Sequence, residues 1–246
     1  MTKTSYIDTI LRAIDDCHRA PNVDITVRLL LSVDRRCTIS DVTDTVNLAA
    51  EYMRKTDHIV VGIDLSGDPR IGDMTLLLPA LSSAKEMGLK LTLHVAEIPR
   101  QWEECVQLLG LIPDRIGHGT FLYTEDTKQN DLVLTMKKHR IPLELCLTSN
   151  MQCQTVSSLD EHHFSFWHQA NHPLIICTDD KGVFSTTLSN EYLLAAETFH
   201  LSPDQIWSLS YGAIDYVFAV DDVKEELRKK WDEIKSTLLR CDGEAV

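Results

Sequence analysis

The feature that most constrains the fold of this chain is an alternation of short, β-branched apolar runs with longer stretches of helical spacing. Strands of near-continuous apolar character that alternate with helices form parallel sheets with helices on both faces. The sequence therefore predicts an α/β fold. The expected strands are residues 24–33, 58–65, 89–96, 114–120, 141–148 and 173–179. The expected helices are residues 4–20, 40–55, 74–87, 131–139, 158–170, 186–199, 202–218 and 221–240.

Composition places the chain among ordinary globular proteins. It has 246 residues, 43% of them hydrophobic, and no Pro/Gly-rich or low-complexity linker, so we expect a single domain over residues 1–246. No apolar run approaches the roughly 20 residues that span a bilayer, and the first ten residues lack an apolar signal-peptide core. Seven scattered cysteines without a CxxC pair argue against disulfides and against a cysteine-ligated zinc. These features favour a soluble, cytosolic protein without a membrane partner.

The balance of charge narrows the class of ligand. The formal net charge is −13 and the sequence pI is about 5.1. A strongly acidic chain does not offer the basic surface that nucleic acids require. A small anionic molecule held by a few local cations remains compatible with this charge.

Polar side chains gather where the expected strands end. In a (β/α) barrel the carboxyl ends of the strands form the rim that carries the chemistry. We therefore expect a TIM-type (β/α)8 barrel with about six of its eight strands, because the chain opens on a helical segment with no strand before it. About two βα units are expected to be absent from the amino end. The polar residues at the strand ends are Asp34, Asp64, Asp68, His94, Glu97, His118, Ser149, Asn150, Asp179 and Asp180.

Two of these strand ends carry histidine. His94 and Glu97 are three residues apart in "LTLHVAE", where they can turn toward one pocket as a zinc ligand and a proton shuttle. His118 lies between two glycines in "RIGHGT", and glycines permit close backbone approach. The alternatives are a strand-end histidine before a helix-start glutamate, and a tight turn with an incidental histidine. Turn chemistry also explains the Ser-Asn pair in "LCLTSN".

Other strand ends carry carboxylates. In "GIDLSGDP" (62–69), Gly67 allows a ligand to bond directly to the backbone. In "IICTDD", Asp179 and Asp180 follow a buried run, and dehydrating two adjacent carboxylates is costly. A divalent metal on one and water or substrate on the other would offset that cost. The alternative is a helix N-cap, although "KGVF" is expected to delay the next helix.

Five motifs in one order identify a resemblance: "DLSGDP", "LHVAE", "DRIGHGT", "LCLTSN" and "ICTDD". Together they resemble the adenosine deaminase family of metal-dependent (β/α)8 hydrolases, from about residue 24 to the C-terminus. "HVAE" and "TDDKGVF" are most similar to the adenosine-deaminase-like branch. That branch removes methylamine from N6-methyl-AMP to give IMP. The resemblance therefore implies a zinc-dependent hydrolytic deaminase of purine 6-amino groups.

Residue by residue, the resemblance implies roles for the polar strand ends. His94 and Asp179 become zinc ligands, and Glu97 becomes the acid that protonates the purine N1. His118 orients the catalytic water and helps to deprotonate it, while Asp180 holds that water and touches the purine. The H-x-E and P-C-x-x-C motifs of the cytidine-deaminase type are absent from the sequence.

The resemblance also implies how substrate is held. The backbone of Gly67 contacts the purine. Asp34 and the arginines at 35–36 end the first expected strand, where a carboxylate suits a ribose hydroxyl and a guanidinium suits phosphate. Lys181 is a further cation near the pocket. The alternative for these charges is a solvated turn. We expect a purine nucleotide, with the nucleoside as the second choice, and a monomeric chain.

The sequence departs from the family pattern in one respect. The family's first strand ends in H-x-H, which supplies two more zinc ligands, and no H-x-H occurs here. The absent βα units would account for this, so we expect a truncated form that binds zinc weakly. The alternative to an active deaminase is therefore a catalytically inactive isoform or a non-enzymatic interaction module.

Overall fold

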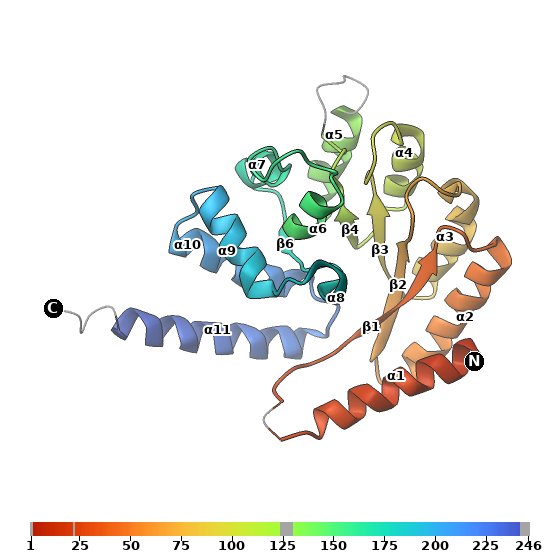
Figure 1. Ribbon diagram of the computed structural model, residues 1–246. Helices are drawn as coiled ribbons and strands as arrows, with labels where there is room; N and C mark the ends of the chain where they lie inside the picture. The colour runs from red at the N-terminus through yellow and green to blue at the C-terminus, as the bar shows by residue number, and fades with distance from the viewer. Residues whose placement is uncertain (1, 22, 124–129, 242–246) are drawn as a thin grey trace. The chain divides into compact units, whose positions relative to one another are not determined.

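The computed structural model describes residues 2–21, 23–123 and 130–241, in which strands and helices alternate along the chain (Figure 1). The strands are β1 (Leu29–Asp34), β2 (Val60–Ser66), β3 (Lys90–Val95), β4 (Arg115–His118), β5 (Leu143–Leu145) and β6 (Leu174–Ile176). The helices are α1 (Lys3–His18), α2 (Ile39–Lys55), α3 (Leu78–Glu86), α4 (Trp102–Gly110), α5 (Asn130–His139), α6 (Leu147–Gln152), α7 (Phe164–Gln169), α8 (Lys181–Phe184), α9 (Leu188–Thr198), α10 (Pro203–Ala213) and α11 (Asp221–Cys241). Two short 3-10 helices span Met74–Leu77 and Ile214–Tyr216.

The chain divides into two compact units. The first consists of Met1–His94 with Val106–Asp114, and the second of Val95–Cys105 with Arg115–Val246. Each unit contains its own run of parallel strands and its own buried apolar residues. The single domain expected from the sequence stays a prediction.

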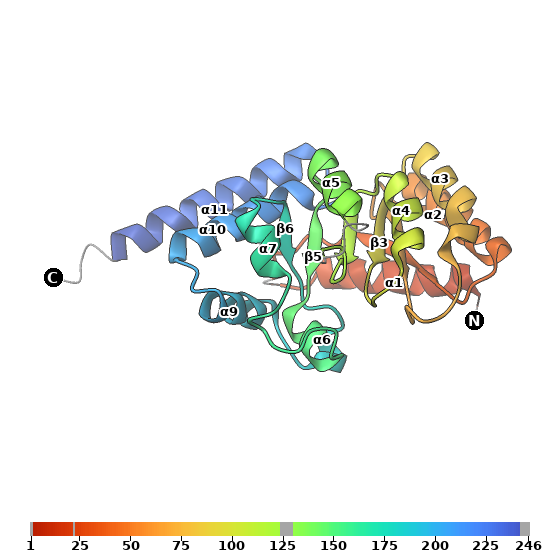
Figure 2. The same ribbon diagram turned by 90° about the horizontal axis from the view of Figure 1, so that it is seen from above.

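In the first unit, β1, β2 and β3 lie side by side in chain order and are parallel. Helix α2 packs on β1 and β2 and lies beside α3 (Figures 1 and 2). This helix begins with a capping box between Thr38 and Asp41 and ends with two basic residues, as the helix dipole favours. Ile63 and Leu65 of β2 are fully buried, in keeping with a parallel strand covered on both faces.

In the second unit, β4, β5 and β6 form the same kind of parallel run. Helices α9 and α10 pack on β6, and α6 contacts both α8 and α9. The two largest fully buried side chains of this unit are Trp167 and Phe164 of α7. Burying two aromatic rings of this size contributes several kcal/mol to folding, so α7 anchors the unit.

The long helix α11 carries many charges and packs against α10. The indole N–H of Trp231 donates to the hydroxyl of Ser210 at 3.0 Å, and Lys235 lies over the ring of Trp207. In the part of the chain that the structure describes, no helix combines the length and the apolar composition needed to cross a membrane.

Several residues at the strand ends adopt backbone angles that side chains usually avoid. His118, which ends β4, has a φ of 59°, and Asp179, three residues beyond β6, has a φ of 53°. Ala96, directly after β3, has a φ of 54°. Non-glycine residues in this left-handed region are strained and tend to cluster at functional sites. The chain is therefore held in costly conformations where the sequence predicts chemistry.

All six expected strands are found among the described residues, with shorter bounds. The strand expected over 24–33 begins at Leu29, and the one expected over 141–148 ends at Leu145 because α6 starts two residues later. The helix expected over 158–170 covers only Phe164–Gln169. There the imidazole of His162 accepts the N–H of Phe164, which competes with the helical pattern.

The expectation that "KGVF" delays the next helix is wrong. Lys181–Phe184 forms α8, which starts directly after Asp180. Its single turn is closed by the N–H groups of Val183 and Phe184, which both donate to the carbonyl oxygen of Asp180. A helix this short contains too few residues to give a periodic signal in a sequence.

Candidate active site

An imidazole lies between two carboxylates in the second unit. His118 Nε2 is 3.6 Å from Asp179 Oδ2 and 3.8 Å from Glu97 Oε2. The side chains of His118, Glu97 and Asp179 are 7%, 18% and 24% exposed. Groups that exchange protons with a bound molecule need both mutual proximity and an opening to solvent. The three residues, predicted separately from their strand ends, meet both conditions.

The adjacent carboxylates of Asp179 and Asp180 diverge. Asp179 Oδ2 accepts a hydrogen bond from the hydroxyl of Ser149 at 2.7 Å, and the same oxygen faces His118. Asp180 is exposed and occupies the N-cap position of α8, but its side chain makes no capping hydrogen bond. Partners on one carboxylate and solvent on the other explain how two like charges can end one buried strand.

The donors around His118 fit a metal ion. Ligand atoms of His118, Cys146 and Asp179 lie within 4.8 Å of one another. Imidazole nitrogen, carboxylate oxygen and thiolate sulfur are all zinc ligands. The neighbouring Cys177 thiol, together with burial, raises the pKa of Cys146 well above its usual value. Cys146 is therefore the donor whose proton the metal itself would have to displace.

His94, the other expected ligand, lies in the first unit near the end of β3. Its Nδ1 is 3.0 Å from the carbonyl oxygen of Leu65 and 3.1 Å from Asp64 Oδ1. Because a carbonyl oxygen only accepts, Nδ1 carries a proton, and Nε2 is the ring nitrogen that would bind a metal. The proton goes to Leu65, and the buried Asp64 Oδ1 has no hydrogen-bond partner among the described residues. Metal-binding histidines are commonly oriented in this way through their second nitrogen.

Two of the residues expected to hold substrate, Asp34 and Gly67, also lie in the first unit, whereas Asp180 and Lys181 lie in the second. Gly67 has a φ of 115°, and a Cβ placed on it would come within 3.2 Å of the carboxylate of Asp34 and of the backbone nitrogen of Arg35. A side chain at this position would therefore crowd the end of β1. The structure brings Asp34 and Gly67 together, as expected for one binding surface.

The arginines beside Asp34 are already engaged. The guanidinium of Arg36 donates two hydrogen bonds to Asp34, at 2.8 and 2.7 Å, and these bonds lower the pKa of Asp34 to about 2. Arg35 is buried, and its Nε donates to the carbonyl oxygen of Ile71 at 3.0 Å. Arg35 therefore holds the loop after β2, whereas the exposed Arg36 retains the freedom to meet an anion.

Four buried polar residues around His118 carry more weight than their sequence signals suggested. Ser149 and Asn150 were expected to serve a turn, yet both are buried in α6. His162 and His163 were expected only as part of a helix, yet their rings stack at 4.2 Å and both are buried. The adjacent histidines in "SLDEHHFSFW" are the one signal that could have identified this pair.

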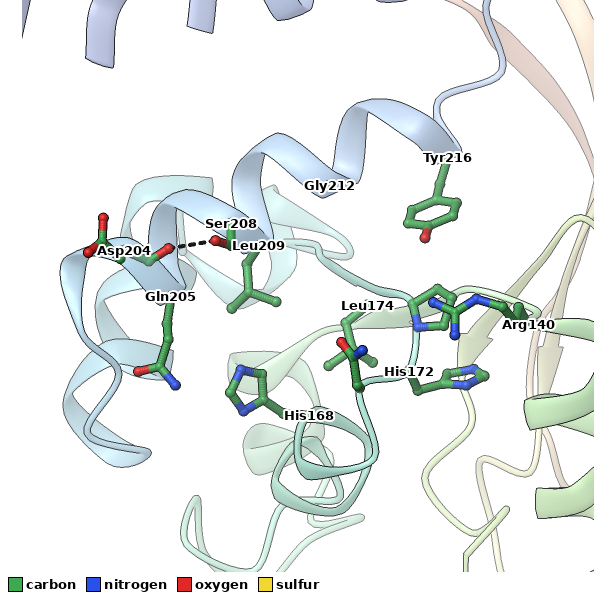
Figure 3. A pocket seen from close by; sticks show the side chains of 12 residues that line it. Arg140, His168, His172, Leu174, Asp204, Gln205, Ser208, Leu209, Gly212 and Tyr216 are labelled. Atoms are coloured by element: carbon green, nitrogen blue, oxygen red, sulfur yellow. Dashed lines mark hydrogen bonds between the residues drawn. The ribbon is translucent and has the colours of Figure 1, made fainter. Parts of the chain in front are cut away.

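A separate pocket of about 320 Å³ lies in the second unit between α10 and the connection from α7 to β6 (Figure 3). His168 and Gln205 line it at one end and Arg140 and Tyr216 at the other (Figure 3). The hydroxyl of Ser208 donates to the carbonyl oxygen of Asp204, one turn earlier in α10, and so stays bonded within that helix. None of the site residues predicted from the sequence lines this pocket, which leaves the His118 cluster as the candidate active site.

The fold and the cluster together define a class. A parallel α/β fold whose strand ends carry imidazole and carboxylate groups fitted to a metal is typical of metal-dependent hydrolases. The sequence model of the family described as "Adenosine deaminase" matches residues 1–234. The chain belongs to the adenosine deaminase family, which confirms the resemblance, the barrel fold class and the deaminase class of enzyme predicted from the sequence.

Individual relatives refine this placement. The chain is 51% identical to the N6-Methyl-AMP deaminase of Mus musculus over 98% of its own length and 67% of the relative's. It is 53% identical to that of Homo sapiens, covering 97% of the chain and 67% of the relative. The crystal structure of Arabidopsis N6-mAMP deaminase superposes with a TM-score of 0.85 at 44% identity, over 95% of this chain and 68% of that one. The chain thus spans about two thirds of the length of these relatives.

Proposed function

We propose that this chain is a zinc-dependent hydrolytic deaminase that converts N6-methyl-AMP to IMP and methylamine. The cluster of Glu97, His118 and Asp179 carries the proposal, because it places two carboxylates within 4 Å of one imidazole. Support also comes from relatives at about 50% identity that are named for this activity. The related Arabidopsis protein has been crystallised as a complex with IMP, the proposed product.

His94 and Asp179 are the residues that we propose would hold the metal. When bound, zinc lowers the pKa of a coordinated water toward about 7 and so supplies a nucleophile at neutral pH. The imidazole of His94 and the carboxylate of Asp179, which are both groups that zinc prefers, support this assignment.

The remaining residues handle the purine and its protons. Attack at C6 breaks the aromaticity of the ring, and Glu97 stabilises the resulting charge by donating a proton to N1. Asp180, exposed beside Asp179, touches the purine and the attacking water. Ser149 holds the Asp179 carboxylate in place through its hydroxyl. His118 lies between the two acids and orients the water.

Substrate would be bound by the residues around the end of β1. The backbone of Gly67 contacts the purine, Asp34 accepts from a ribose hydroxyl, and Arg36 meets the phosphate. Arg36 must then share its guanidinium between Asp34 and phosphate, which its exposed side chain permits. Lys181, exposed in α8, is a second cation for the phosphate.

We propose that weak binding of zinc limits the deaminase activity of this chain. No H-x-H pair occurs in the sequence, so only two of the family's four zinc ligands can be named. Each lost ligand weakens a zinc site strongly. We therefore propose that the chain holds zinc weakly and works only when zinc is supplied in excess.

We also propose that the chain is a monomer in the cytosol. The six cysteines from Cys17 to Cys177 form no disulfide bond, which suits a reducing compartment. Cell fractionation and light scattering on the purified chain test these two points.

A comparison of substrates tests the proposed reaction. With zinc in excess, we expect the chain to release methylamine from N6-methyl-AMP faster than from N6-methyladenosine. Arg36→Ala should reduce the rate on the nucleotide more than the rate on the nucleoside, with the exposed Arg12→Ala as a matched control. Faster turnover of the nucleoside by the unaltered chain would contradict the choice of a nucleotide.

A further inference from the structure

The pocket beside α10 lies at the opposite end of the strands from the candidate active site. Its lining includes Arg140, which precedes β5, and Pro173 and Leu174, which precede and begin β6. Asp179, in contrast, follows the carboxyl end of β6. Parallel strands present their amino ends on one side and their carboxyl ends on the other. This pocket, which we call the α10 pocket, therefore has no part in the proposed deamination.

Three polar side chains of the α10 pocket make no hydrogen bond or ion pair with any residue that the structure describes. They are the guanidinium of Arg140, the side-chain amide of Asn171 and the hydroxyl of Tyr216. Arg140 and Asn171 each follow a helix in the left-handed conformation, with φ of 48° and 51°. Backbone hydrogen bonds of 3.2 and 3.0 Å, from the next residue back to the helix, fix both turns. The backbone is thus held in place while the polar groups stay available to a bound molecule.

The wall between these polar groups is apolar and leaves room. The side chains of Leu174 and Leu209 point into the pocket (Figure 3). Gly212 of α10 also lines it, and a Cβ placed there would have no packing partner within 4 Å among the described residues. Glycine weakens a helix relative to alanine, so packing inside the protein does not explain its presence. Close approach of a bound molecule to the backbone of α10 does.

The charges around the pocket suit one negative group at one end. Although the chain is acidic overall, the end of α5 carries the basic run "KKHR" at 137–140. Burial is the main cause that lowers the pKa of His172 in the pocket wall to about 4, and the charges of Arg140 and Lys137 lower it further. The positive potential of these cations therefore reaches the pocket. At the other end Asp204 contributes a carboxylate, which disfavours a second negative group there.

We propose that the α10 pocket binds a small monocarboxylate with an apolar body and a hydroxyl group at its far end. The carboxylate meets the planar guanidinium of Arg140, which matches two carboxylate oxygens, with the hydroxyl of Tyr216 as a second donor. The apolar body lies over Leu174, and the far hydroxyl meets His168 and Gln205. All of these residues lie outside the His118 cluster, so this site does not depend on the proposed deaminase activity.

Titration of the full chain, labelled with nitrogen-15, with 4-hydroxybenzoate tests the proposal by NMR. The backbone amide signals of Gly212 and Asn171 report on the pocket. We expect saturable shifts with a Kd of about 1 mM or lower, which a ligand of this size can reach. The amide 4-hydroxybenzamide has the same shape without the charge and should bind about tenfold more weakly. Inorganic phosphate should not displace the carboxylate.

Variants locate the binding site. Arg140→Gln removes the charge and should weaken binding about tenfold, whereas Lys138→Gln changes an exposed cation of the same run outside the pocket lining and should leave binding unchanged. Gly212→Leu should fill the pocket and abolish binding while the chain keeps its circular dichroism spectrum, because leucine favours a helix. If Gly212→Leu does not fold, the comparison of Arg140→Gln with Lys138→Gln decides.

Several results would overturn the proposal. One is the absence of a saturable shift at about 10 mM 4-hydroxybenzoate. Another is binding that is unchanged in Arg140→Gln or that survives in a folded Gly212→Leu chain. Equal binding of the amide, or displacement by phosphate, would exclude a monocarboxylate as the ligand. A chain that binds 4-hydroxybenzoate as expected yet never deaminates N6-methyl-AMP would contradict only the proposed function.

Discussion

Glu191 is a buried carboxylate whose removal should destabilise the second unit. It lies in α9 with none of its surface exposed. It accepts hydrogen bonds from the N–H of Thr148 at 3.0 Å, from the hydroxyl of Thr148, and from the hydroxyl of Thr186 at 2.6 Å. Thr148 belongs to α6, which also carries Ser149 and Asn150. Glu191 therefore ties α9 to the helix that holds Asp179 and His118.

The cost of replacing Glu191 follows from these contacts. A hydrogen bond to a charged group contributes about 1.5–3 kcal/mol, and a buried donor left unsatisfied costs about 1–3 kcal/mol. The two hydroxyls can turn to other acceptors, whereas the N–H of Thr148 cannot. Glu191→Gln keeps the volume but sets an amide against donors, so we expect a loss of about 2–3 kcal/mol. Glu191→Ala adds a cavity and should cost about 4 kcal/mol.

Urea unfolding followed by circular dichroism measures both losses. Glu197→Gln, on the exposed face of the same helix, is the matched control and should stay within about 0.5 kcal/mol of the unaltered chain. A Glu191→Gln chain that is equally close to the unaltered one would refute the reasoning, because the three hydrogen bonds would then contribute nothing measurable.

Two further predictions concern Glu97, the proposed proton donor, and the buried histidines. Glu97→Gln should lower kcat about 10²–10⁴-fold while zinc content, measured by mass spectrometry, stays the same; the exposed Glu103→Gln is its control, and unchanged turnover in Glu97→Gln would exclude the acid role. Burial lowers the pKa of His162 to about 2 and the pKa values of His163 and His172 to about 4. Histidines of the unfolded chain titrate near 6.5. Below that pH the unfolded chain therefore binds more protons than the folded chain. The free energy of unfolding should thus fall as the pH drops from about 6.5 toward 4, and His172→Phe should flatten that slope in urea titrations; a stability independent of pH over this range would contradict the prediction.

Much of the fold could be predicted from the sequence because parallel strands have a simple signature. Runs such as "HIVVGIDL" are buried on both faces and stand out as continuous apolar segments. The short helices α6 and α8 could not be predicted, since six and four residues are too few for a helical period. The pattern thus identified the elements that build the core and missed those that close the strand ends.

The candidate site divides in the same way. Glu97, His118 and Asp179 were predictable because the ends of parallel strands meet at one edge, so polar residues there converge. The group of buried polar residues around His118 was not predictable. It depends on left-handed backbone angles and on the packing of His162 against Asn150, which are set by tertiary contacts and leave no periodic trace. The residues proposed to touch substrate were therefore visible in the sequence, whereas the buried polar residues packed behind His118 were not.

Zinc-dependent turnover of N6-methyl-AMP by the purified chain tests the central claim most directly. The chain is first treated with a chelator, then titrated with zinc, and IMP is measured by chromatography and mass spectrometry. Because the family resemblance assigns only His94 and Asp179 as zinc ligands in this chain, we predict negligible IMP without added zinc. IMP formation should then rise with zinc and be lower by about 10²–10⁴-fold in Glu97→Gln at every zinc concentration. A folded chain that forms no IMP even when saturated with zinc, or one that forms it equally fast in the chelator, would contradict the account.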